Sequence, residues 1–202
     1  MGFGRICEAQ DSTRKHTSYI ATEFLTGIAS LSSGNPPMYF QPQVAIGTRF
    51  TNSFFIQVTA GYGQFKNEGL QYDYVRDYKA TGYFFIVSPT VYEEKWRKFS
   101  LHYVLNAGYT RVKHEGIFSL DNYPIEVRNP IGEHFSTLFT GPGIRFEYFL
   151  HPSVSVHGEA NVHYIWQRGQ NLSPAFIPGA GYLDSPGNYL TLNLRGFLAY
   201  RF

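Results

Sequence analysis

The last fourteen residues of the chain, 189–202, alternate between two kinds of side chain. One row contains Leu190, Leu192, Leu194, Gly196, Leu198, Tyr200 and Phe202, and the other contains Thr191, Asn193, Arg195, Phe197, Ala199 and Arg201. Successive side chains of a β-strand point to opposite faces, so the segment predicts a strand with one apolar and one largely polar face. This pattern is typical of strands that cross an outer membrane, with the apolar row against lipid and the polar row facing a lumen.

The same alternation recurs along the chain and predicts eight strands. We expect them at residues 17–28, 40–50, 54–63, 79–92, 99–109, 142–148, 154–166 and 189–202. Short connections alternate with long ones: the short ones are 51–53, 93–98 and 150–153, and the long ones are 29–39, 66–78, 113–134 and 168–188. The pattern predicts an all-β fold, an eight-stranded antiparallel up-and-down transmembrane β-barrel with short periplasmic turns and longer extracellular loops. Pro89 weakens the strand at 79–92, because proline cannot donate to a ladder.

The barrel is expected to occupy residues 17–202, and residues 1–16 are expected to be a leader remnant or a disordered N-terminus. Cys7-Glu8-Ala9 has the small-x-small pattern of a signal-peptidase site, but the six residues before it are too few for a complete signal peptide. Two interpretations remain open: a truncated leader with a mature protein that begins near Gln10, or an unprocessed start. Cys7 is the single cysteine, which excludes an internal disulfide and a CxxC motif.

Composition agrees with a barrel and excludes other classes. Aromatic residues make up 18% of the chain, which suits aromatic girdles at two membrane interfaces. The mean hydropathy is only −0.24, and no stretch approaches the roughly 18 apolar residues of a transmembrane helix. A net charge of +2 is too small to indicate a nucleic-acid partner.

On these strands and on the terminal Phe202, the chain resembles the small eight-stranded outer-membrane proteins, the group of the outer-membrane protein A membrane domain and outer-membrane protein X. The resemblance covers roughly residues 17–202. It implies an integral protein of the outer membrane of a Gram-negative bacterium, in contact with membrane lipid and lipopolysaccharide. It also implies that the barrel-assembly machinery reads Phe202 as its signal. The group shares no active site, so the resemblance assigns no catalytic residue and no cofactor.

A soluble, lipocalin-like barrel is the alternative fold. It would turn the apolar rows inward and expose Glu159, His163 and Arg195 to water. We disfavour it because the polar rows contain few lysines and many small or amide residues, which suit a narrow lumen better than an open surface.

The polar rows predict a network of charged side chains inside the barrel. Its expected members are Glu23, Arg49, His102, Arg145, Glu147, His157, Glu159, His163, Arg195 and Arg201. An eight-stranded barrel is just wide enough for side chains to fill, and charges buried there must pair. We therefore predict a polar, plugged interior without a solute pore. His157 and His163 cannot share a metal ion, because six residues of strand span about 20 Å.

An enzyme that modifies lipopolysaccharide is the alternative function. His157 with Glu159, or Ser100 with His102, would then act as acid and base. The His-x-Ser-Asn stretch of lipid A deacylases has no convincing counterpart, since His163 is followed two residues later by Ile165. Palmitoyl transfer needs an open lumen for an acyl chain, which a polar plug opposes.

The preferred function is non-catalytic: envelope structure, display of surface loops, or a place as a subunit of an envelope complex. The loops 113–134 and 168–188 contain apolar residues that could bind a protein partner, namely Phe118, Tyr123, Ile125, Phe176 and Tyr182. The same residues could instead extend the neighbouring hairpins beyond the membrane, which for 113–134 is our slight preference.

Overall fold

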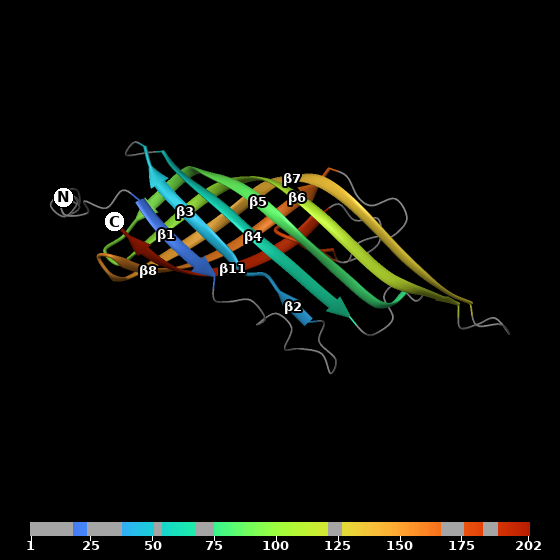
Figure 1. Ribbon diagram of the computed structural model, residues 1–202. Coiled ribbons are helices and arrows are strands. Elements are labelled where there is room, and N and C mark those ends of the chain that lie inside the picture. The colour runs from blue at the N-terminus through green and yellow to red at the C-terminus, as the bar shows by residue number, and fades with distance from the viewer. Residues whose placement is uncertain are drawn as a thin grey trace, which may run out of the picture.

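Eight strands of the computed structural model close into an antiparallel barrel (Figure 1). The model describes residues 18–23, 38–50, 54–67, 75–120, 127–166, 176–183 and 190–202. The barrel strands are β1 (Ser18–Glu23), β3 (Gln43–Arg49), β4 (Phe55–Asn67), β5 (Val75–Lys95), β6 (Phe99–Leu120), β7 (Val127–His151), β8 (Val154–Ile165) and β11 (Leu190–Arg201). Each pairs with the next, and β1 also pairs with β11, which confirms the predicted fold class. In this part of the chain, no helix is long and apolar enough to cross a membrane.

The first and last strands close the cylinder through a continuous ladder. Tyr19 pairs with Arg201 of β11, and the backbone N–H of Phe202 donates to the carbonyl oxygen of Ser18 at 3.0 Å. The short connections lie at this same end of the barrel, which we call the turn end. Phe50 N–H, for example, donates to the carbonyl oxygen of Phe54 at 2.9 Å. The opposite end is the hairpin end, where β6 and β7 extend beyond the other strands (Figure 1).

The predicted rows face the predicted sides. The outer surface carries a band of exposed apolar side chains from several strands, including Val44, Ile46, Leu105, Ile144, Leu192 and Leu194. Their neighbours in sequence point inward and are buried, among them Gln43, Asn106, Arg145 and Arg195. Water would penalise such an outer surface and lipid would not, so the soluble, lipocalin-like alternative is wrong.

A charge placed in the apolar band should therefore be expensive. We expect Leu194→Arg to lower the free energy of unfolding in lipid vesicles by about 2–4 kcal/mol, the cost of an arginine near the bilayer midplane. Tyr200→Arg, on the same row of β11 but near the turn end, should cost about 1 kcal/mol or less. Urea unfolding followed by tryptophan fluorescence would measure both. Equal effects of the two substitutions would contradict a band centred on Leu194.

Several strands are longer than the alternation predicted. β5, β6 and β7 contain 21, 22 and 25 residues, so most of the predicted loop 113–134 is strand. The slight preference for an extended hairpin there is confirmed, and the description of 113–134 as an open loop is wrong. β5 also continues through Pro89, which pairs with Ile56 of β4. The ladder between β5 and β6 is irregular between Thr90 and Tyr92, and such a bulge lets a strand accommodate a proline.

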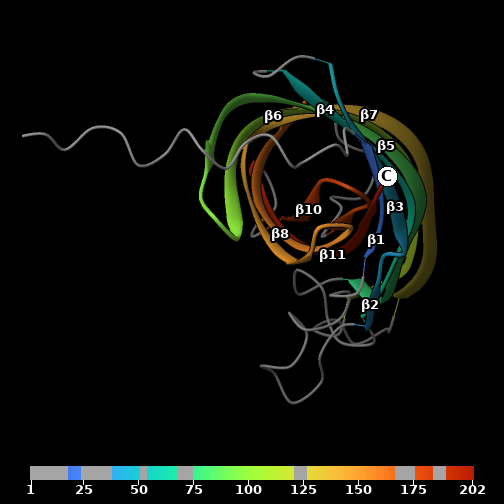
Figure 2. The ribbon, with the colours of Figure 1, turned by 90° about the vertical axis from the view of Figure 1, so that its left-hand side faces the viewer.

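Three short strands lie outside the ring of eight. β2 (Met38–Phe40) pairs with β4, while β9 (Phe176–Ile177) and β10 (Gly181–Leu183) form a hairpin whose second strand pairs with β11. Viewed along the barrel, β10 lies inside the ring (Figure 2). Ile177 and Ala180 are completely buried. Part of the predicted outer loop 168–188 is therefore an inward plug, which we call the plug hairpin (176–183).

Candidate functional site

The inward row of β8 runs along the lumen and fixes the height of each group in it. The row contains Ser155, His157, Glu159, Asn161, His163 and Ile165, all of which are buried. Alternate residues of a strand are about 6.6 Å apart. These six side chains therefore mark successive levels of the lumen from the turn end to the hairpin end.

Glu147 of β7 is the centre of the lowest level. Arg201 Nε donates to Glu147 Oε1 at 3.0 Å, and His157 Nε2 lies 3.1 Å from the same oxygen. His102 lies between two carboxylates, with Nε2 3.5 Å from Glu147 Oε2 and Nδ1 3.7 Å from Glu93 Oε1. Arg49 Nη2 is 2.7 Å from Glu93 Oε2. Two carboxylates are thus neutralised by two arginines at the turn end.

The level of Glu159 contains a row of three charges on adjacent strands. Arg145 of β7 and Arg195 of β11 are both direct cross-strand neighbours of Glu159. Arg145 Nε donates to Glu159 Oε1 at 2.6 Å, and Arg195 Nη2 lies 2.7 Å from Glu159 Oε2. Gln57 Nε2 reaches across the lumen from β4 and donates to Glu159 Oε1 at 3.1 Å. One buried carboxylate is thereby shared by two buried guanidinium groups.

The predicted lumen residues converge, but in pairs that the sequence did not indicate. His157 and Glu159 bind different partners, because alternate residues on one strand contact different levels of the lumen. Glu23 is half-buried opposite Phe197 of β11. Sequence analysis did not include Gln57 and Glu93 in the network. Gln57 could have been included, since it lies on the polar row of its predicted strand, whereas Glu93 fell in a predicted turn.

Neither candidate catalytic pair has the geometry of an activated nucleophile. His157 Nε2 contacts both Ser155 Oγ, at 2.9 Å, and Glu147 Oε1. In a nucleophile–base–carboxylate arrangement the two partners bind opposite ring nitrogens, so that the carboxylate orients the base. Neither ring nitrogen of His102 forms a hydrogen bond, so Ser100 is not activated by it. Among the described residues, no three metal-ligating side chains converge.

The upper levels of the lumen hold the plug hairpin in place. His163 Nδ1 lies 2.9 Å from the carbonyl oxygen of Ala180, and Thr191 Oγ1 donates to the same oxygen at 2.7 Å. Asn193 Nδ2 donates to the carbonyl oxygen of Gly179 at 2.8 Å. Gly179 has a φ of 80°, and a Cβ on it would lie 2.5 Å from the ring of Phe84. A glycine is therefore needed at the point where the turn meets the barrel wall.

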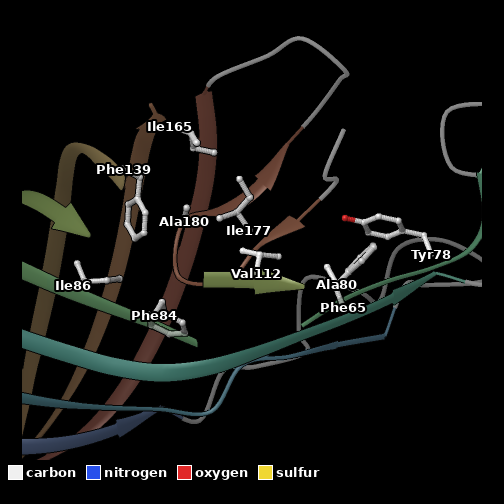
Figure 3. Close-up of a cluster of buried hydrophobic side chains, with 10 residues drawn as sticks. All are labelled: Phe65, Tyr78, Ala80, Phe84, Ile86, Val112, Phe139, Ile165, Ile177 and Ala180. Carbon is white, nitrogen blue, oxygen red and sulfur yellow. The ribbon is translucent and has the colours of Figure 1, made fainter. Parts of the chain in front are cut away.

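An apolar cluster fills the lumen around this hairpin. It contains Phe65, Tyr78, Ala80, Phe84, Ile86, Val112, Phe139, Ile165, Ile177 and Ala180 (Figure 3). A second buried cluster, nearer the turn end, contains Tyr19, Ala21, Ala45, Phe55, Phe197 and Ala199. The interior is therefore plugged, but the prediction of a polar plug is wrong for these two layers. The consecutive apolar residues Phe84, Phe85 and Ile86 were the available signal, because such a run indicates a strand that is apolar on both faces.

The predicted surface-loop residues are separated by the fold. Phe118 lies in β6, near the outer end of the long hairpin, where its backbone pairs with Asn129. Tyr123 and Ile125 lie outside the described residues. Phe176 and Tyr182 pair with each other in the plug hairpin, so they are not part of the same outward segment as Phe118.

One titratable group belongs to the hairpin beyond the apolar band. His114 of β6 is buried beside the rings of Tyr78 and Phe135, and its Nε2 lies 3.3 Å from Glu133 Oε2. Burial lowers the pKa of His114, and the nearby Glu133 carboxylate opposes this only in part. The folded hairpin therefore favours the neutral imidazole.

Acid should loosen this part of the hairpin. The unfolded chain takes up a proton on His114 at a higher pH than the folded chain, so stability present above about pH 6.5 is lost below it. We expect faster amide hydrogen exchange in 110–117 at pH 5 than at pH 7, after correction for the intrinsic rate. His114→Phe should remove this difference, whereas His134→Gln, at an exposed position of β7, should retain it. A pH effect that survives His114→Phe would assign it to another group.

Comparison with known proteins supports the fold. No protein-family model and no curated protein sequence matches the chain. A major outer membrane protein from Thermus thermophilus is 17% identical, with a TM-score of 0.53 over 93% of this chain and 100% of that chain. The attachment invasion locus protein of Yersinia pestis, Ail, is 14% identical, with a TM-score of 0.44 over 93% and 99%. The closed strand order, the outward apolar band and the similarity to the Thermus protein together show that this chain has the fold of the small eight-stranded outer-membrane β-barrels.

Proposed function

We propose that the protein is a non-catalytic, integral outer-membrane barrel that presents the outer part of its β6–β7 hairpin at the cell surface. The length of this hairpin carries the proposal. Tyr109 and Leu138 are the last cross-strand pair with exposed apolar side chains, and eleven further pairs follow, up to Leu120 with Val127. Eleven residues of strand extend about 36 Å, which takes the hairpin well beyond the membrane.

The outward side chains above the apolar band support this placement. Arg111, Lys113 and Ser136 are exposed where the strands leave the band. Arginine and lysine at this height would meet the phosphates of lipopolysaccharide, which gives the barrel a partner in the outer leaflet. A protein partner would contact the hairpin further out, around Phe118.

The filled lumen argues against transport and catalysis. Charged pairs, the two apolar clusters and the plug hairpin occupy the levels from His157 to Ile165. Catalysis would need a serine and a base in alignment, and the contacts of His157 and His102 do not provide it. The barrel is thus a rigid support, and a surface interaction would reside in the hairpin.

Surface labelling would test the display. In a Cys7→Ser background, Lys113→Cys places a thiol on the hairpin, and Lys98→Cys places one at the turn end. An impermeant maleimide should label Lys113→Cys in intact cells, and Lys98→Cys only after the envelope is opened. Labelling of Lys98→Cys alone in intact cells, or of neither, would overturn the proposed orientation.

Mass spectrometry of lipid A would test the non-catalytic part separately. Lipid A incubated with the refolded protein in mixed micelles should keep its mass at several pH values and with divalent ions. Loss or gain of an acyl chain would make the barrel an enzyme, whatever the labelling shows. His157→Gln would then identify whether the turn-end charges are responsible.

The terminal Phe202 is the proposed assembly signal. Its side chain is exposed at the end of β11, and its backbone N–H closes the barrel against Ser18. Deletion of Phe202 should reduce the amount of folded protein in the outer membrane several-fold, because the assembly machinery would lose its recognition element. Refolding of the purified protein into detergent should change little. A comparable loss in both assays would assign Phe202 a role in stability alone.

A further inference from the structure

The lumen contains polar donors that no protein acceptor satisfies, and they lie at one height. Arg195 Nε and Nη1, Asn161 Nδ2 and Gln43 Nε2 are buried without a hydrogen-bond partner. All three side chains are almost fully buried, with exposed fractions of 2%, 1% and 3%. Buried N–H groups are normally paired, so a group of them in one layer indicates a ligand that accepts hydrogen bonds.

The layer has a defined floor and roof. Below it, Glu159 is held by Arg145, Arg195 and Gln57. Above it, the turn of the plug hairpin is fixed by Asn193 Nδ2 at 2.8 Å from the carbonyl oxygen of Gly179. Figure 3 shows Ala180 and Ile177 of this hairpin among the apolar side chains that cover the layer from the hairpin end. Bulk water therefore has no open route to these donors through the described residues.

The donors are oriented by neighbours and not merely left over. Asn161 Oδ1 accepts a hydrogen bond from Asn106 Nδ2 at 2.8 Å, which turns the Asn161 amino group away from β6. A Cβ on Gly143 would lie 2.0 Å from Asn161 Oδ1, so the glycine makes room for this amide. The Arg195 guanidinium is anchored by a single contact, Nη2 to Glu159 Oε2, which leaves its other nitrogens directed elsewhere.

The charges of the layer point to the sign and size of the ligand. Arg145 and Arg195 share the single carboxylate of Glu159, so the three groups sum to one positive charge. Buried charge without compensation is costly, and one negative charge would balance it. Glu23, on β1, is the other acidic residue near β11, but it lies opposite Phe197 and is only half-buried.

We propose that this layer binds one small monovalent anion of the halide class, held by Arg195, Asn161 and Gln43 beneath the plug hairpin. The anion accepts hydrogen bonds from the guanidinium and the two amides and neutralises the excess charge of the Arg145–Glu159–Arg195 row. It is thus a structural ligand of the lumen. A polyvalent anion is disfavoured because the Glu159 carboxylate lies directly below.

Ion-specific stabilisation would test the site. We expect the thermal unfolding midpoint of the refolded protein to be about 5 °C higher in 100 mM sodium chloride than in 100 mM sodium gluconate, since gluconate is too large to enter. Equal ionic strength removes general screening as a cause. Crystals grown in sodium bromide should show an anomalous peak in contact with Arg195. Equal midpoints in the two salts, or a water molecule in place of bromide, would overturn the proposal.

Asn161→Asp is the informative variant. It retains the acceptor for Asn106 and supplies the missing negative charge covalently, so the chloride–gluconate difference and the bromide peak should both disappear. Lys113→Gln, which removes one positive charge outside the lumen, should leave both unchanged. If Asn161→Asp folds and keeps the chloride effect, the ion binds elsewhere and the proposal fails. If Asn161→Asp does not fold, the bromide map of the unmodified protein decides alone.

Discussion

Replacing Glu159 by glutamine is expected to lower the free energy of unfolding by about 3–5 kcal/mol, because two buried guanidinium groups would lose their shared counter-charge. Arg145 and Arg195 are 1% and 2% exposed, and the side chain of Glu159 is completely buried. Glutamine keeps the shape and one acceptor oxygen but not the charge. The loss should therefore be electrostatic, with little change in packing.

Urea unfolding in detergent micelles would measure this effect, and two variants control it. Glu115→Gln removes a carboxylate from an exposed pair with Lys113 and should cost well under about 1 kcal/mol. The double variant Glu159→Gln/Arg195→Met removes one charge of each sign and should recover part of the loss. A cost for Glu159→Gln no larger than that for Glu115→Gln would mean that the row does not stabilise the barrel.

Phe84→Ala is expected to cost about 3–5 kcal/mol, because it leaves a cavity in the middle of the apolar cluster. The Phe84 ring packs against the turn of the plug hairpin at Gly179 and against Gly61 of β4. Neither contact can collapse easily, because both involve backbone held by sheet pairing or by the turn.

The neighbouring residue gives a matched control. Phe85 is the same side chain on the same strand, but it faces outward and is 47% exposed. Phe85→Ala should cost less than about 1 kcal/mol, because acyl chains refill the space that the ring leaves. Unfolding of both variants in lipid vesicles would compare the two faces directly. Similar costs would show that the lumen around Phe84 is loosely packed, and the plug hairpin would then not seal the barrel.

The alternation along the chain determined the strands, their order and the side that each row faces. The period of two is a local property, and burial against lipid or against other side chains selects the face. The segments 40–50 and 54–63 predicted the hairpin of β3 and β4, and Leu190 to Arg201 predicted the two faces of β11. The members of the lumen network also followed, since they are the charged residues on the inward rows.

The tertiary structure alone decided which groups meet and what fills the outer half of the lumen. His157 contacts Glu147 and not Glu159, because levels in the lumen depend on the stagger between strands and not on sequence spacing. The plug hairpin folds inward because Ile177 and Ala180 find apolar partners on β5, β6 and β7, far away in sequence. No local pattern distinguishes such a hairpin from a solvated loop, since its stabilisation comes from burial that exists only after the barrel has closed.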